Sequence, residues 1–143
     1  MRADFEKRVQ SVDWSGYSHP CMQDQSLIPG LLLQMVRGSD DLKLMAAKRL
    51  WDIAAHQANV GPSLVPAAEF LIELLEDQAA VVQCENLDTL YQFSNYLGGE
   101  SWSAELRSSF VGALPLFERL STSAHEDVSA FAKMIVENIE ADE

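Results

Sequence analysis

Cysteine, glycine and proline are all scarce in this chain of 143 residues. The two cysteines, Cys21 and Cys84, lie far apart in different kinds of sequence, so a disulfide framework is not expected. Cys84 falls on the apolar side of a predicted helix, where a thiol packs as a small hydrophobic group. The 7 glycines and 5 prolines lie mostly between periodic segments, which favours uninterrupted regular structure.

Positive charge is also scarce. Lysine and arginine number 10 against 22 aspartates and glutamates, which gives a formal net charge of −12. A field of this sign repels phosphate groups and anionic lipids, so no nucleic acid and no membrane is expected as a direct partner. The same field speeds encounter with a basic protein. Solubility alone is an equally good explanation of the acidic composition.

Long hydrophobic runs are absent from the sequence. No segment approaches the ~20 apolar residues that a membrane-spanning helix requires. The first ten residues, MRADFEKRVQ, lack the apolar stretch of a signal peptide. A cytoplasmic protein is therefore the expectation.

The motifs of catalysis and of nucleotide binding are missing too. There is no GxSxG turn for a nucleophile and no glycine-rich phosphate loop. His19, His56 and His125 fall in separate loops or at helix ends. His19 and Cys21 have no second ligand pair at metal-binding spacing, and His56 suits a helix C-terminus, where it caps free carbonyl groups. We therefore expect no enzyme, no catalytic residue, no metal and no cofactor.

Apolar residues that step by three and four dominate the chain, and no alternating, β-branched segment occurs. The pattern predicts one all-α domain over residues 1–143, built from about three antiparallel helix pairs. After an irregular lead-in at 1–24, the pairs cover 25–57, 62–96 and 103–140. Ala3–Val9 within the lead-in is predicted as a short helix.

Punctuating residues mark the ends of several helices. Gly38 followed by Ser39 predicts a helix stop and a new N-cap, and Pro115 predicts a kink or a division of its helix. The second helices of the first two pairs have predicted inward stripes made of Leu42, Met45, Ala46, Leu50, Ile53 and Ala54, and of Val81, Cys84, Leu87, Leu90 and Tyr91.

The first two pairs also repeat one another. SLIPGLLLQMVRGSDDLKLMAAKRLWDIAAHQ and SLVPAAEFLIELLEDQAAVVQCENLDTLYQFS each hold an aliphatic helix, a polar turn and an amphipathic helix. Such a unit cannot bury its own apolar face and must stack on a neighbour. The segment DDLKLMAAKRLWDIAAHQANVGPSLVPAAEFLIELLED resembles the small HEAT-like repeat proteins of bacteria. That resemblance extends from about residue 25 to residue 95.

The resemblance implies an α-α superhelix whose faces bind other proteins. Several small acidic proteins of this kind are similar to the immunity proteins of bacterial toxin systems, which bind and block one toxin. The expected partner is then a toxin domain with a basic surface. The alternative is a HEAT-like adaptor or accessory subunit of a bacterial complex. An uncovered end helix also leaves open a homodimer of the free protein.

Two sets of side chains are candidates for a binding surface. If the second helices of successive pairs line one surface, the side chains that project from them form a contiguous acidic patch. The side chains expected in this patch are Trp51, Asp52, Glu85, Asp88, Thr89 and Gln92. Trp51 is either an interface anchor or a tryptophan filling the groove between pairs. Acids on the first helix of the second pair are predicted to form a solvated face, and these are Glu69, Glu73, Glu76 and Asp77. Trp14 and Tyr17 are predicted as a lid over the first helices, with a partner contact as the alternative.

Overall fold

The computed structural model describes residues 2–14, 27–55 and 61–141, and within these ranges it is helical with no strand. The helices are α1 (Arg2–Ser11), α2 (Ile28–Gln34), α3 (Asp40–Leu50), α4 (Leu64–Leu74), α5 (Ala80–Phe93), α6 (Ser103–Gly112), α7 (Leu114–Leu120) and α8 (Glu126–Ala141). Short turns extend three of them, namely the π-helical turn η3 (Trp51–Ala55) and the 3₁₀ turns η4 (Leu75–Asp77) and η5 (Ser94–Tyr96). The prediction of an all-α fold is confirmed.

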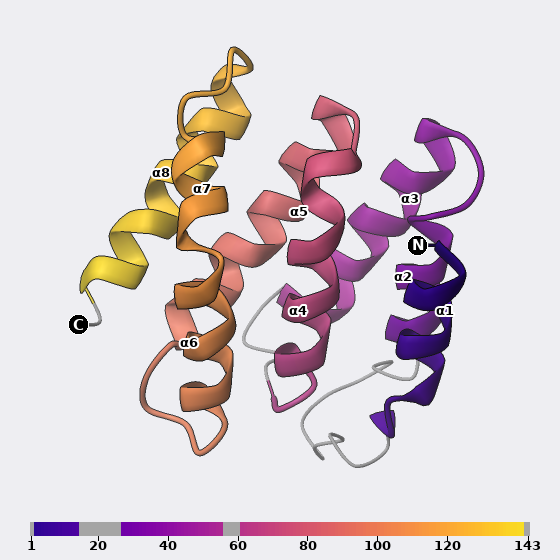
Figure 1. Ribbon diagram of the computed structural model, residues 1–143, viewed down its shortest axis with the longest axis horizontal. Helices are drawn as coiled ribbons and strands as arrows, with labels where there is room; N and C mark the ends of the chain where they lie inside the picture. The colour runs from indigo at the N-terminus through magenta and orange to yellow at the C-terminus, as the bar shows by residue number, and fades with distance from the viewer. Residues whose placement is uncertain (1, 15–26, 56–60, 142–143) are drawn as a thin grey trace.

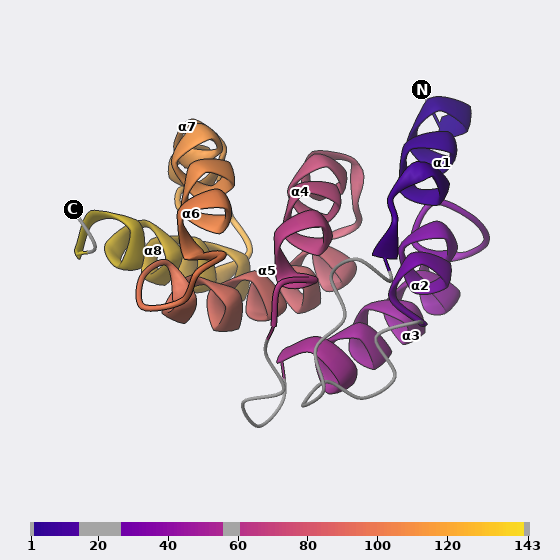
Figure 2. The ribbon, with the colours of Figure 1, turned by 90° about the horizontal axis from the view of Figure 1, so that it is seen from below.

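The helices form two layers (Figures 1 and 2). The second helices of the three pairs, α3, α5 and α8, form one layer with α5 in the middle. The second layer covers one face of the first and contains α4 and the α6–α7 segment. At the amino-terminal end, α2 and α1 are stacked on α3.

Neighbouring second helices α5 and α8 run in the same direction. The ring centroids of Tyr91 and Phe131 are 6.2 Å apart, and further along both helices Asn138 Nδ2 donates a hydrogen bond to Ser94 Oγ at 2.7 Å. Residue numbers therefore increase together along the two helices. Side chains at matching positions of the two helices consequently meet on a common surface.

The predicted helix boundaries at glycine, serine and proline are confirmed. Gly38 has a φ of 76°, and a Cβ there would lie 3.0 Å from Leu42 Cδ1. Ser39 Oγ accepts a hydrogen bond from the amide of Leu42 at 3.3 Å and so caps α3. Pro115 sits in the first turn of α7, where its missing N–H costs nothing, and the predicted fifth helix is divided into α6 and α7.

The first part of the lead-in is regular. The short helix predicted at Ala3–Val9 is confirmed as α1. Phe5 is only 2% exposed and its ring meets that of Phe70 on α4 edge-on, with centroids 5.3 Å apart. Trp14 Nε1 donates a hydrogen bond to Val9 O at 2.9 Å, and its ring lies 6.3 Å from that of Phe70. Trp14 thus packs against α1 and α4, whereas Tyr17 lies outside the described residues.

The predicted inward stripes are wrong at three positions. Leu42, Met45 and Val81 are 54%, 65% and 51% exposed, although each was expected to face the core. The other residues predicted for the stripe of α3 and η3 are buried, namely Ala46, Leu50, Ile53 and Ala54, and Ala47 is buried beside them. On α5, Val82 is buried in place of Val81. Periodicity locates an apolar side of a helix to within about one residue, and the packed neighbours decide which of two adjacent apolar residues is covered. Cys84, expected to be buried, is only partly covered.

Candidate functional site

The side chains predicted to form an acidic patch lie mostly on the surface of the layer made by α3, α5 and α8. Asp52 in η3 is exposed, and Glu85, Asp88 and Gln92 on α5 are half-buried. Trp51 is half-buried and packs against the core.

Thr89 does not belong to this surface, so that part of the prediction is wrong. Its side chain is fully buried, and its Oγ1 donates a hydrogen bond to Glu85 O at 3.3 Å within α5. The reason is that α5 packs against α3 on one side and α8 on the other. Only a narrow strip of α5 is left for solvent, and Thr89 falls outside it.

The carboxylates on this surface act on one another electrostatically. The pKa of Glu85 is raised above 4.5, chiefly because partial burial penalises its charged form. The neighbouring Asp88 and Asp52 also raise the Glu85 pKa, while Lys48 lowers it. Carboxylates from the α3–η3 segment and from α5 are therefore close enough to repel one another.

A fourth carboxylate extends the cluster onto α8. Partial burial raises the pKa of the Cys84 thiol, and Asp127 raises it further, ahead of Glu85 and Asp88. Asp127 is exposed in the first turn of α8. We call Asp52, Glu85, Asp88 and Asp127 the acidic band. Sequence reasoning missed Asp127. The signal was an acidic residue in the first turn of the helix that ends the third pair, which a parallel arrangement of the second helices brings next to the acids of α5.

Two exposed apolar side chains lie beside the acidic band. Met45 precedes Lys48 by three residues on α3, and Val81 precedes Glu85 by four residues on α5. Residues at these spacings share one face of a helix. Each apolar side chain therefore lies one turn before the charged residues, on the same surface of the layer.

The acids predicted to form a solvated face on α4 and η4, Glu69, Glu73, Glu76 and Asp77, are all exposed, as predicted. Two of them, Glu73 and Glu76, also pair with neighbouring helices. Both oxygens of the Glu73 carboxylate accept hydrogen bonds from Arg8 on α1, with Nη1 at 2.9 Å from Oε2. This pairing raises the pKa of Arg8. Glu76 Oε2 in η4 lies 3.2 Å from Arg119 Nη2 on α7, so that α4 and the turn η4 after it are connected by ion pairs to the elements on both sides.

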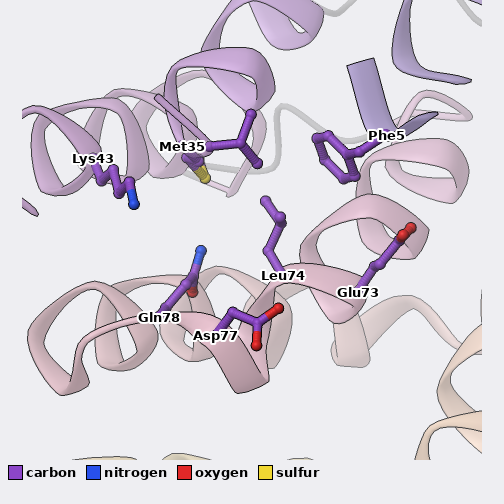
Figure 3. A pocket seen from close by; sticks show the side chains of 8 residues that line it. Phe5, Met35, Lys43, Glu73, Leu74, Asp77 and Gln78 are labelled. Carbon is purple, nitrogen blue, oxygen red and sulfur yellow. The ribbon is translucent and has the colours of Figure 1, made fainter. Parts of the chain in front are cut away.

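A cavity of about 370 Å³ lies between the first two helix pairs (Figure 3). Residues of α1, α3, α4 and η4, together with residues directly after α2 and η4, line it, namely Phe5, Met35, Val36, Lys43, Glu73, Leu74, Asp77 and Gln78. Sequence reasoning did not find this cavity, because its walls come from separate segments that span 74 residue numbers between Phe5 and Gln78, about half of the chain. A shallower groove lies between α4 and the α6–α7 segment, on the side of the Glu76–Arg119 pair.

The histidine and cysteine positions weighed for metal binding lie largely outside the described residues, since these exclude His19, Cys21 and His56. Among the residues that the structure does describe, no three His, Cys, Asp or Glu side chains are grouped to hold a metal ion. None of the helices there combines the length and apolar character needed to cross a membrane. Comparison with protein-family models, curated proteins and solved structures gives no match.

Proposed function

We propose that this chain is a protein-binding module, and most specifically an immunity protein that binds a cognate bacterial toxin and covers its active site. The observation that carries the proposal is the acidic band. Its four carboxylates come from three segments far apart in the sequence and gather on one layer of the fold, in a chain of net charge −12. A surface of this kind complements a basic groove on a partner.

Occlusion is the mechanism that this surface supports. Long-range attraction steers the basic partner onto the α3–α5–α8 layer and raises the association rate. Met45 and Val81, exposed beside the acidic band, then supply apolar contact area, whose loss of water on docking slows dissociation. If the toxin is a nuclease, the carboxylates occupy the positions of nucleic-acid phosphates.

A HEAT-like stack of helix pairs is part of this proposal. The common direction of α5 and α8 supports it, because repeated pairs in one orientation bring their second helices to a single surface. The partner is a protein with a basic surface, and the setting is the cytoplasm.

The alternative function, an adaptor or accessory subunit, is favoured by a different observation. The cavity between the first two helix pairs is of the size that small molecules occupy, about 300–1,000 Å³. An accessory subunit that carries a ligand would use such a cavity, whereas simple occlusion does not need it.

The test is isothermal titration calorimetry against a catalytically inactive product of the neighbouring gene, at low and moderate salt. One-to-one binding that salt weakens supports the proposal. Asp88→Lys is expected to weaken binding by at least about tenfold, because it reverses a charge within the acidic band. Glu105→Lys is the matched control, since it makes the same charge change on exposed α6 in the other layer.

The outcomes separate the two functions. Equal weakening by Asp88→Lys and Glu105→Lys would leave net charge as the driving force and reject the acidic band as the contact surface. Absence of binding at both salt concentrations would reject the immunity function and favour the adaptor.

A further inference from the structure

The cavity between the first two helix pairs has apolar inner walls. Phe5 and Met35 are 2% exposed and Val36 is 6% exposed, and Leu74 closes the side toward α4. Phe5 on α1, Met35 directly after α2 and Leu74 on α4 turn toward the same space (Figure 3). An aliphatic group placed there would lose most of its contact with water.

Two nitrogen-bearing side chains enter the cavity on one side. The Nζ of Lys43 on α3 and the Nε2 of Gln78 after η4 point toward the space beneath Met35 (Figure 3). Lys43 is half-buried and forms no salt bridge with any residue in the described ranges. A half-buried ammonium group without a counter-ion is a strong attractor for an anion.

The amide of Gln78 has an unused hydrogen-bond donor. Its Oε1 accepts from Nδ2 of the fully buried Asn86 at 3.1 Å, while its own Nε2 is buried with no hydrogen-bond acceptor among the described residues. Buried N–H groups are normally paired, so the site offers a donor that a ligand oxygen would satisfy.

The cavity also has two acidic residues, with different roles. Glu73 is already paired with Arg8 of α1, so its charge is compensated. Asp77 is exposed at the rim, and its carboxylate points away from Lys43 (Figure 3). The positive and donor groups thus lie on one side of the cavity, with a single uncompensated acid at its edge.

We propose that this cavity is a binding site for a small aliphatic carboxylate. The carboxylate accepts hydrogen bonds from Lys43 Nζ and Gln78 Nε2, and the aliphatic body lies against Phe5, Met35 and Leu74. Two sources share this chemistry, namely a simple branched carboxylic acid and an apolar amino acid whose ammonium group faces Asp77. The site is separate from the acidic band, and the inference does not depend on the proposed function.

The experiment is a titration of the whole protein with 4-methylpentanoate, followed through the methyl NMR signals of Met35, Val36 and Leu74. Binding in the millimolar range or tighter is expected for a ligand of this size. The neutral analogue 4-methylpentan-1-ol is expected to bind about tenfold more weakly, because it lacks the charge-assisted hydrogen bonds. Leucine serves as the second probe, and whether it binds more tightly or more weakly than the acid identifies the source.

Variants assign the binding to the cavity. Lys43→Met is expected to weaken 4-methylpentanoate binding by about tenfold while leaving the alcohol unaffected. Lys48→Met is the matched control on the exposed side of α3 and should bind as the parent protein does. Gln78→Leu provides a second test if Lys43→Met does not fold. Equal binding of acid and alcohol, no effect of either cavity variant, or no shift of the three methyl signals would each overturn the proposal.

Discussion

The substitution Phe5→Ala tests whether α1 is an integral part of the fold. Phe5 is 2% exposed, and its ring packs edge-on against Phe70 with centroids 5.3 Å apart. Truncation of a buried phenylalanine to alanine costs about 3–5 kcal/mol in free energy of unfolding. Phe5 also lines the cavity, so part of its surface already lacks packing partners, which places the expected loss near the lower limit, at about 3 kcal/mol.

That loss is large compared with the stability of a domain. Since single domains are stable by about 5–15 kcal/mol, Phe5→Ala removes a large fraction of the total. For a chain of this length the expected fall in Tm is about 10 °C. Urea unfolding followed by circular dichroism measures the change, and Lys7→Ala, an exposed position in the same helix, should lie within about 0.5 kcal/mol of the parent protein.

Two results would refute this reasoning. A destabilisation below about 1 kcal/mol, close to that of Lys7→Ala, would mean that α1 does not pack on α4 as described. Loss of hydrogen-exchange protection in α1 alone, with the rest of the protein unchanged, would mean that α1 unfolds independently of the helix pairs.

Two further predictions concern pH and backbone conformation. The pKa of Glu85 is raised above 4.5 in the folded state, so the folded protein holds the carboxyl proton of Glu85 more tightly than the unfolded chain does. The free energy of unfolding therefore falls as the pH rises from about 4.5 through the raised pKa. Glu85→Gln should therefore be more stable than the parent at pH 7, by about 0.5 kcal/mol because the site is half-exposed, with no difference below pH 4.5. Equal stability at pH 7 would contradict the penalty that partial burial and the neighbouring carboxylates place on the charged form of Glu85. Gly112→Ala should stabilise by about 0.4–1 kcal/mol, since a Cβ there meets nothing within 4 Å. Gly38→Ala should destabilise the protein by more than that, because φ at Gly38 is 76° and the new Cβ would lie 3.0 Å from Leu42 Cδ1. Thermal melts in which the Tm of both glycine variants shifts in the same direction would contradict these two predictions.

The local features of the fold could be predicted well, because each depends on a few consecutive residues. Gly38 and Ser39 end one helix and begin the next through a positive φ and a hydroxyl cap. Pro115 divides a helix because it lacks an N–H. The helix at the amino terminus follows from the spacing of Phe5 and Val9, which are both buried.

The direction in which individual side chains point could be predicted less well. Val81 and Val82 are equally apolar, yet only Val82 is buried. Met45 was assigned to the core and is exposed, and Thr89 was assigned to the surface and is buried. Each error shifts the buried face by about one residue around the helix. Periodicity shows which side of a helix is apolar, but it does not show how much of that side the neighbouring helices cover.

The sequence by itself determined the helical content, the helix ends and the acidic net charge, since these follow from spacing, capping chemistry and composition. Only the tertiary structure decided which distant groups meet. It paired Glu73 with Arg8, gathered Asp127 with the carboxylates of α5, and enclosed Lys43 in a cavity with Phe5. The physical reason is that side-chain spacing along a helix is set within a few residues, whereas contacts between helices depend on how whole pairs stack.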